Sequence, residues 1–109
     1  MIHTIIYEQD NEIHAFEISG HANSGPYGYD LVCAAVSAVS FGAVNAVLEL
    51  CELALDIEQG GEGGYLFVAI PTNCSTHQKQ RAQLIFEAMV VSLQTIEREY
   101  HKFIKIKRK

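Results

Sequence analysis

The sequence contains little that would cross-link or stiffen the chain: no tryptophan, two prolines and three cysteines in 109 residues. An odd number of cysteines does not suggest a disulfide framework. The N-terminus lacks the positively charged segment and the cleavage pattern of a secretory signal peptide. We therefore expect reduced thiols and a cytoplasmic protein. With 49% hydrophobic and 19% charged residues, the composition fits one globular domain over residues 1–109.

Positive charge is absent from residues 1–78, which contain acidic side chains but no lysine or arginine. All eight basic residues lie at or after Lys79. This distribution predicts either two solvated faces of opposite charge or an acidic half that attracts a basic ligand. The formal net charge of −5 argues against nucleic acid as the main partner, so we expect no direct nucleic-acid binding.

An uncharged run from Leu31 to Leu48 is just long enough to suggest a transmembrane helix. Asn45 and two serines interrupt the run, and its flanks are acidic. No lysine or arginine lies nearby to set an orientation in a membrane. We therefore expect a buried helix and no membrane partner.

Four segments have the periodicity of β-strands. Residues 2–18 alternate as a hairpin with a polar turn at residues 9–11. The apolar run at residues 65–70 is typical of a central strand, and residues 101–108 predict a last strand. The segment DIEQGGEGG, residues 56–64, is expected to be a flexible acidic loop.

Two helices complete the predicted fold. The first runs from an N-cap at Asp30 to about Leu53, and the second begins with a cap at Asn73, Ser75 or Thr76. The order ββαβαβ predicts an α+β fold, with a mostly antiparallel four-stranded sheet and two helices packed on it. The expected apolar side of the second helix consists of Leu84, Ile85, Ala88, Met89, Leu93 and Ile96.

Small residues are frequent in the first helix and would allow another helix to approach closely. The apolar surface of this helix is also wider than one sheet face needs, which suggests a homodimer. The small residues are Ala34, Ala35, Ala38, Gly42, Ala43 and Ala46.

Cys33 and His21 are the candidate reactive residues. With Asp30 as N-cap, Cys33 falls in the first helical turn, where free N–H groups and the helix dipole favour a thiolate. At helical spacing, Cys33, Ser37 and Ser40 share one polar stripe, which would leave the thiol accessible. His21 follows a strand that ends near residue 19 and could take the thiol proton.

Three interpretations of these residues remain open on spacing alone. Cys33 and His21 could be a catalytic pair, or Cys33 could be a buried apolar cysteine beside a loop histidine. They could also join Cys74 and His77 in a Cys₂His₂ zinc site. Asp30 could cap the helix or orient the imidazole, and capping is the preferred role.

The segment GHANSGPYGYDLVCAAVSAVSFGAVNAV, residues 20–47, resembles the signature of the ribosomal-processing cysteine protease family, Prp. The shared elements are GHA, a glycine-containing loop ending in YG-x-D, VCA, a serine four residues after the cysteine, and a downstream asparagine. VSLQTIEREY, residues 91–100, resembles the second helix of that family, so the likeness covers essentially the whole chain.

The resemblance implies a bacterial cytosolic homodimer with Cys33 as nucleophile and His21 as base. Asp30 and Ser37 fall on motif positions with supporting roles. The implied substrate is the short, basic N-terminal extension of a large-subunit ribosomal protein, cleaved after a phenylalanine. No cofactor or metal is implied.

The loop that carries His21 contains glycines at positions 20, 25 and 28, each of which permits a positive φ. We expect Gly20, Gly25 and Gly28 to make this loop mobile, and the loop to become ordered when a peptide binds.

A non-enzymatic alternative starts from the basic C-terminal segment, Lys102–Lys109. In that case the chain would be a ribosome-associated module that binds a basic ribosomal protein or rRNA, and Cys33 would have no chemical role.

Overall fold

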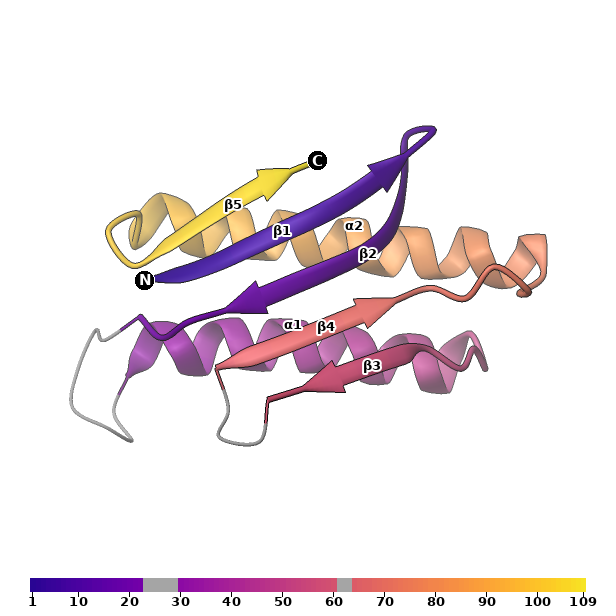
Figure 1. Ribbon diagram of the computed structural model, residues 1–109, viewed down its shortest axis with the longest axis horizontal. Helices are drawn as coiled ribbons and strands as arrows, with labels where there is room; N and C mark the ends of the chain where they lie inside the picture. Colours follow the sequence, from indigo (N-terminus) through magenta and orange to yellow (C-terminus); the bar gives the residue numbers. More distant parts are fainter. Residues whose placement is uncertain (23–29, 61–63) are drawn as a thin grey trace.

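The computed structural model describes residues 1–22, 30–60 and 64–109 of the chain. Its sheet has the strand order β3-β4-β2-β1-β5, and both helices pack on one face of it (Figure 1). The opposite face carries no helix in the described residues and is turned toward the viewer in Figure 1. The elements are β1 Ile2–Gln9, β2 Glu12–Ser19, α1 Leu31–Leu50, β3 Asp56–Gln59, β4 Tyr65–Ala69, α2 Thr76–Glu99 and β5 Ile104–Arg108.

The α+β class is as predicted, but the four-stranded sheet is wrong because the sheet has five strands and is mixed. β5 runs parallel to β1, with Ile2 opposite Ile104, while the other pairs are antiparallel. The missed strand is β3, in the segment predicted to be a loop. All four of its residues are exposed, so it lacks the buried alternation by which strands are recognised.

The β1–β2 hairpin confirms the predicted turn. Asp10 and Asn11 form it with φ values of 55° and 63°, the left-handed conformation that two-residue hairpin turns require. Next to the turn the β1–β2 register shifts, and α2 holds β2 at this point. The Gln83 side chain accepts from the Ile13 N–H at 2.7 Å and donates to the Ile13 carbonyl at 2.6 Å.

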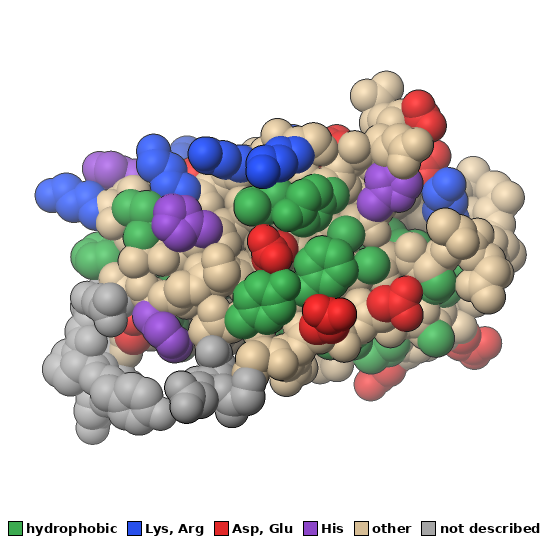
Figure 2. Space-filling view, in the orientation of Figure 1, with side chains coloured by type: hydrophobic (Ala, Val, Ile, Leu, Met, Phe, Trp, Pro, Cys, Tyr) green, Lys and Arg blue, Asp and Glu red, His purple; other side chains and the backbone are tan. Residues whose placement is uncertain are grey.

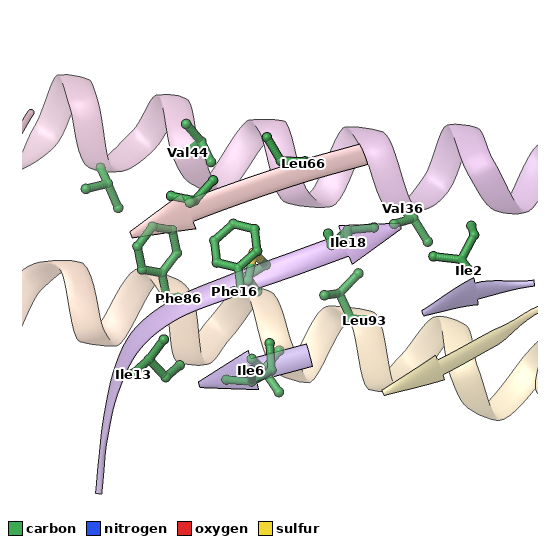
Figure 3. Packing of buried hydrophobic residues seen from close by; sticks show 14 of the residues in the cluster. Ile2, Ile6, Ile13, Phe16, Ile18, Val36, Val44, Leu66, Phe86 and Leu93 are labelled. Carbon is green, nitrogen blue, oxygen red and sulfur yellow. The ribbon is translucent and has the colours of Figure 1, made fainter. Parts of the chain in front are cut away.

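The core lies between the sheet and the two helices (Figure 3). Phe16 of β2 meets Phe86 of α2 edge to face, with ring centroids 5.3 Å apart. Burying one such side chain stabilises the fold by about 1.5–3 kcal/mol. α2 is therefore fixed to the sheet by large aromatic side chains, while α1 contributes smaller ones, such as Val36 and Val44, to the same core (Figure 3).

α2 begins at Ser75, one of the three predicted caps, in a capping box with Gln78. Its predicted apolar side is partly wrong: Met89 and Leu93 are buried, but Leu84 is 74% exposed and Ala88 is also exposed. The buried stripe is rotated from the predicted one and consists of Ala82, Phe86, Met89, Val90 and Leu93.

α1 ends at Leu50, three residues before the predicted end. It is the one described helix long and apolar enough to cross a membrane, a test that core helices also pass. One side of α1 is buried in the core, at Val32, Val36, Val44 and Val47. Its other side is exposed and mainly apolar, with Asn45 and Glu49 as polar residues toward its C-terminal end.

Candidate functional site

The N-terminus of α1 positions Cys33. The Asp30 carboxylate accepts a hydrogen bond from the Cys33 N–H at 3.0 Å, and the Asp30 carbonyl accepts from the Ala34 N–H at 3.0 Å. Asp30 is therefore the N-cap, as predicted, and Cys33 lies in the first turn. The Cys33 N–H, which a helix start could otherwise offer to a substrate, is engaged in this cap.

The Cys33 thiol is half-buried and is hydrogen-bonded to the segment that follows β2. Its Sγ accepts a hydrogen bond from the Ala22 N–H at 3.2 Å. A hydrogen bond donated to sulfur favours the anionic form, as does the helix N-terminus. Ala22 directly follows His21, so this contact brings the histidine segment to the helix start.

Two glycines set the position of His21: Gly20, which precedes it, and Gly64, whose backbone lies beside its side chain. Gly20 has a φ of +92°, donates to the Gly64 carbonyl at 2.8 Å, and would clash with the Met1 carbonyl oxygen if it had a Cβ. A Cβ on Gly64, whose φ is +75°, would lie 2.6 Å from Nε2 of His21. The exposed imidazole therefore rests directly against the Gly64 backbone.

These residues meet at a cavity of about 260 Å³, which we name the Cys33 cavity. Of the predicted site residues it includes His21, Cys33, Ser37 and Gly20, while Asp30 acts from the helix cap. The Cys33 cavity is lined by Ile2, Ile18, Gly20, His21, Cys33, Val36, Ser37, Ser40, Phe41, Gln59, Gly60, Gly64, Tyr65 and Leu66.

The predicted polar stripe on α1 is only partly correct. Ser37 is exposed, but Ser40 is 2% exposed and its hydroxyl donates to the Val36 carbonyl at 2.8 Å. Gly25 and Gly28 of the predicted mobile loop lie outside the described residues. The mobility of that loop stays a prediction.

Sequence reasoning missed the wall of the cavity that comes from the β3–β4 hairpin. Gln59, Gly60 and Gly64 line the cavity from a segment that had been expected to be a loop, and Tyr65 lines it from the start of the predicted strand that follows. Ile57 is the one apolar residue of β3, between Asp56 and Glu58, so the sequence offered no alternation long enough to predict this strand.

Tyr65, at the rim of the cavity, is hydrogen-bonded to a carboxylate that carries negative charge. Its hydroxyl donates to the Glu17 carboxylate at 2.9 Å. The pKa of Tyr65 is raised above its ordinary value of 10.0, first by this hydrogen bond, then by burial, and then by the charges of Glu17 and Glu58. The rim therefore suits a cation better than an anion.

The zinc alternative fails on geometry. Cys74 lines a separate cavity beside His14 and Lys79, away from Cys33. Among the residues that the structure describes, no group of three or more His, Cys, Asp or Glu side chains could hold a metal ion. Cys51 is buried in the core, as predicted.

Comparisons with known proteins show which proteins the chain is similar to. The model of a family described as cysteine protease Prp matches residues 1–105. A Bacillus subtilis (strain 168) ribosomal processing cysteine protease Prp is 45% identical over 103 residues, 94% of this chain and 92% of that protein. The chain superposes on the Staphylococcus aureus protease Prp bound to a covalently linked product peptide, with a TM-score of 0.91 and 39% identity. It superposes on the same protease bound to a substrate peptide with a TM-score of 0.84 and 38% identity. Both superpositions cover 100% of each chain.

Proposed function

The chain belongs to the cysteine protease Prp family, and we propose that this cysteine-type peptidase removes the N-terminal extension of a large-subunit ribosomal protein during ribosome assembly. One observation carries the proposal: Cys33 and His21 line the same cavity, and the Cys33 sulfur accepts the N–H of the residue after His21. The relatives that share this fold include a protease bound to its substrate peptide.

Cys33 and His21 would act as nucleophile and base in an acyl transfer. His21 takes the thiol proton, and the sulfur bonds to the carbonyl carbon of the scissile peptide. His21 then gives the proton to the leaving amine as the C–N bond breaks. Water hydrolyses the thioester, which releases the new carboxylate and restores the thiol.

Three neighbours would support this chemistry. The Ala22 N–H stabilises the negative sulfur before attack. Asp30 fixes the first turn of α1, so that Cys33 faces the cavity. Ser37, exposed one turn further along α1, can hydrogen-bond a bound peptide.

The walls of the Cys33 cavity fit the residue after which the family is expected to cut. Ile2, Ile18 and Leu66 supply apolar walls, and Phe41 contributes an aromatic ring. A phenylalanine side chain would be favourably removed from water there. The acidic character of the first 78 residues suits the positive charge expected of a ribosomal-protein extension.

Replacing the nucleophile tests the proposed function. We expect the wild-type protein to cut a peptide that spans the extension of its own organism's ribosomal protein. Cys33→Ala and His21→Ala should each lower kcat/KM by at least about a thousandfold, because the two residues act as a unit. Cys74→Ala and His77→Ala, which change residues outside the Cys33 cavity, should cut normally. Equal cutting by Cys33→Ala and wild type, measured by mass spectrometry of the products, would disprove the assignment.

We further propose that the peptidase is a homodimer that works in the cytoplasm. The exposed side of α1 supports the dimer, since Leu31 is 71% exposed and Ala34, Ala38 and Gly42 lie on the same side. Ala38→Glu should shift the sedimentation coefficient from dimer to monomer, while Ala88→Glu, the same change at an exposed residue of α2, should not. A wild-type monomer at micromolar concentration would contradict the proposal, and cell fractionation tests the location.

A further inference from the structure

β3 is an edge strand that runs into the wall of the Cys33 cavity. Gln59, its last residue, and the adjoining Gly60 both line the cavity. In the described part of the chain β3 pairs with β4 only, and all four of its residues are exposed. A chain that leaves the cavity along the sheet would therefore meet an unpaired strand.

The hydrogen bonding of β3 shows which main-chain groups point outward. The Gly60 N–H donates to the Tyr65 carbonyl at 3.1 Å, and the same register pairs Glu58 with Phe67 and Asp56 with Ala69. Hydrogen-bonded and non-hydrogen-bonded pairs alternate along antiparallel strands, so Glu58 and Asp56, two and four residues before Gly60, also belong to hydrogen-bonded pairs. The N–H and C=O groups of the intervening residues, Ile57 and Gln59, consequently point away from β4.

The side chains of β3 add a charge preference to this edge. Asp56 and Glu58 sit opposite Ala69 and Phe67, whereas the basic side chains of the sheet lie along β5 at the other edge (Figure 2). Glu17 accepts a hydrogen bond from Tyr65 at 2.9 Å and so adds a further negative charge beside the cavity rim.

We propose that the outer edge of β3 binds an extended, positively charged segment of the substrate as an added strand, continuous with the peptide in the Cys33 cavity. Main-chain hydrogen bonds to Ile57 and Gln59 would hold the segment, and Asp56 and Glu58 would select lysine or arginine. The inference rests on the proposed peptidase function, because it takes the occupant of the edge to be the substrate.

A proline at position 57 removes an outward N–H while sparing the pairing of β3 with β4, because proline is tolerated where the N–H faces solvent. Ile57→Ala is the matched control, since it loses the side chain but keeps the N–H. We expect Ile57→Pro to lower kcat/KM about fivefold to tenfold relative to Ile57→Ala, on a substrate long enough to reach β3. A peptide of about four residues, which spans about 13 Å and fills only the cavity, should be cut equally by both variants.

Reversing the charge of one β3 side chain tests the preference for a positively charged segment. Glu58→Lys should lower kcat/KM for a lysine-containing long peptide about tenfold at low salt, and less at high salt. Glu99→Lys makes the same charge change at an exposed position at the end of α2 and should have no such effect. A long peptide with glutamines in place of lysines should be insensitive to both variants.

Binding separates this inference from the proposed function. Fluorescence anisotropy of a labelled long peptide with Cys33→Ala protein needs no catalysis, so it works even if the wild type cuts nothing. Weaker binding in the Ile57→Pro background than in the Ile57→Ala background supports the edge proposal. Equal binding in the two backgrounds overturns it, even if the peptidase function stands. Loss of self-association in Ile57→Pro, with peptide binding unchanged, also overturns it and assigns the edge to a second copy of the chain.

Discussion

The two edges of the sheet are built in opposite ways. At β5 the outward Ile106 N–H donates to the Glu97 carboxylate at 2.8 Å, and Lys105 and Lys107 project from the strand into solvent. At β3 every residue is exposed and two of the four are acidic. Lysines and a covered N–H are ways in which proteins block an edge against unwanted pairing. The comparison suggests that one edge is protected while the other is kept available for a ligand.

Arg108 strengthens the protected edge. Its guanidinium lies 3.1 Å from Glu8 of β1 and 3.2 Å from Glu87 of α2. Hydrogen bonds to Glu87 and then Glu8 raise the pKa of Arg108. Exposed pairs of this kind contribute about 0–1 kcal/mol each, so their role is to fix the position of β5 more than to stabilise it. The basic segment that could have indicated rRNA binding thus forms a paired strand.

Among the changes that compare the two edges, the largest expected effect comes from Gly64, whose backbone lies against the imidazole of His21. Gly64→Ala would place a Cβ 2.6 Å from the His21 imidazole, so the flexible imidazole must move. Because a small misplacement of a reacting group costs about a hundredfold, we expect kcat to fall by about that factor with KM nearly unchanged. Steady-state kinetics on the short peptide measure both constants.

Two control variants test whether the effect of Gly64→Ala depends on its place beside His21. Gly42→Ala changes a glycine of α1 that has no heavy atom within 4 Å of its added Cβ, and should stabilise the helix by up to about 1 kcal/mol. Lys105→Ala changes the protected edge and should leave the kinetics unchanged. If Lys105→Ala lowers kcat as much as Gly64→Ala does, the β5 edge affects catalysis as much as the β3–β4 hairpin, and the contrast between the two edges is wrong.

A smaller effect is expected from Glu97, which covers the β5 edge. Glu97→Ala leaves the Ile106 N–H without its partner and should lower the free energy of unfolding by about 1–3 kcal/mol, measured by urea denaturation. The exposed N–H should also increase self-association in sedimentation experiments. Glu97→Gln keeps an acceptor oxygen and should show less of both effects. An unchanged Glu97→Ala protein would mean that the carboxylate does not guard the edge.

Local signals in the sequence were enough to predict the parts of the fold that depend on neighbours in the chain. The Asp10–Asn11 turn and the caps at Asp30 and Ser75 follow from residue types at short spacing. The parallel pairing of β5 with β1 and the rotated face of α2 depend on contacts between distant segments. Periodicity alone therefore could not give the orientation of β5 or the exposure of Leu84.

The candidate site also contains residues that a local sequence pattern indicates and residues that only strand pairing brings in. Cys33 and His21 were found because the segment between residues 20 and 47 has a recognisable pattern. Gly64 and Tyr65 were missed because they reach the cavity beside His21 through the pairing of β2 with β4, which sets Ser19 opposite Tyr65. The capping of the Cys33 N–H by Asp30 also changes which main-chain donors remain for a substrate.

The pairing of Ile2 with Ile104 also has a consequence for how the molecule folds. β1 and β2 are joined by a two-residue turn and can pair soon after both exist, whereas β1 must wait for a strand almost a full chain length away. Such distant contacts slow folding, because the chain loses the conformational entropy of a long loop before the contact can stabilise it. Until β5 arrives, β1 is itself a bare edge rich in isoleucine. The interval before β5 pairs with β1 is therefore when the chain is most prone to aggregate, and that pairing removes the exposed edge of β1.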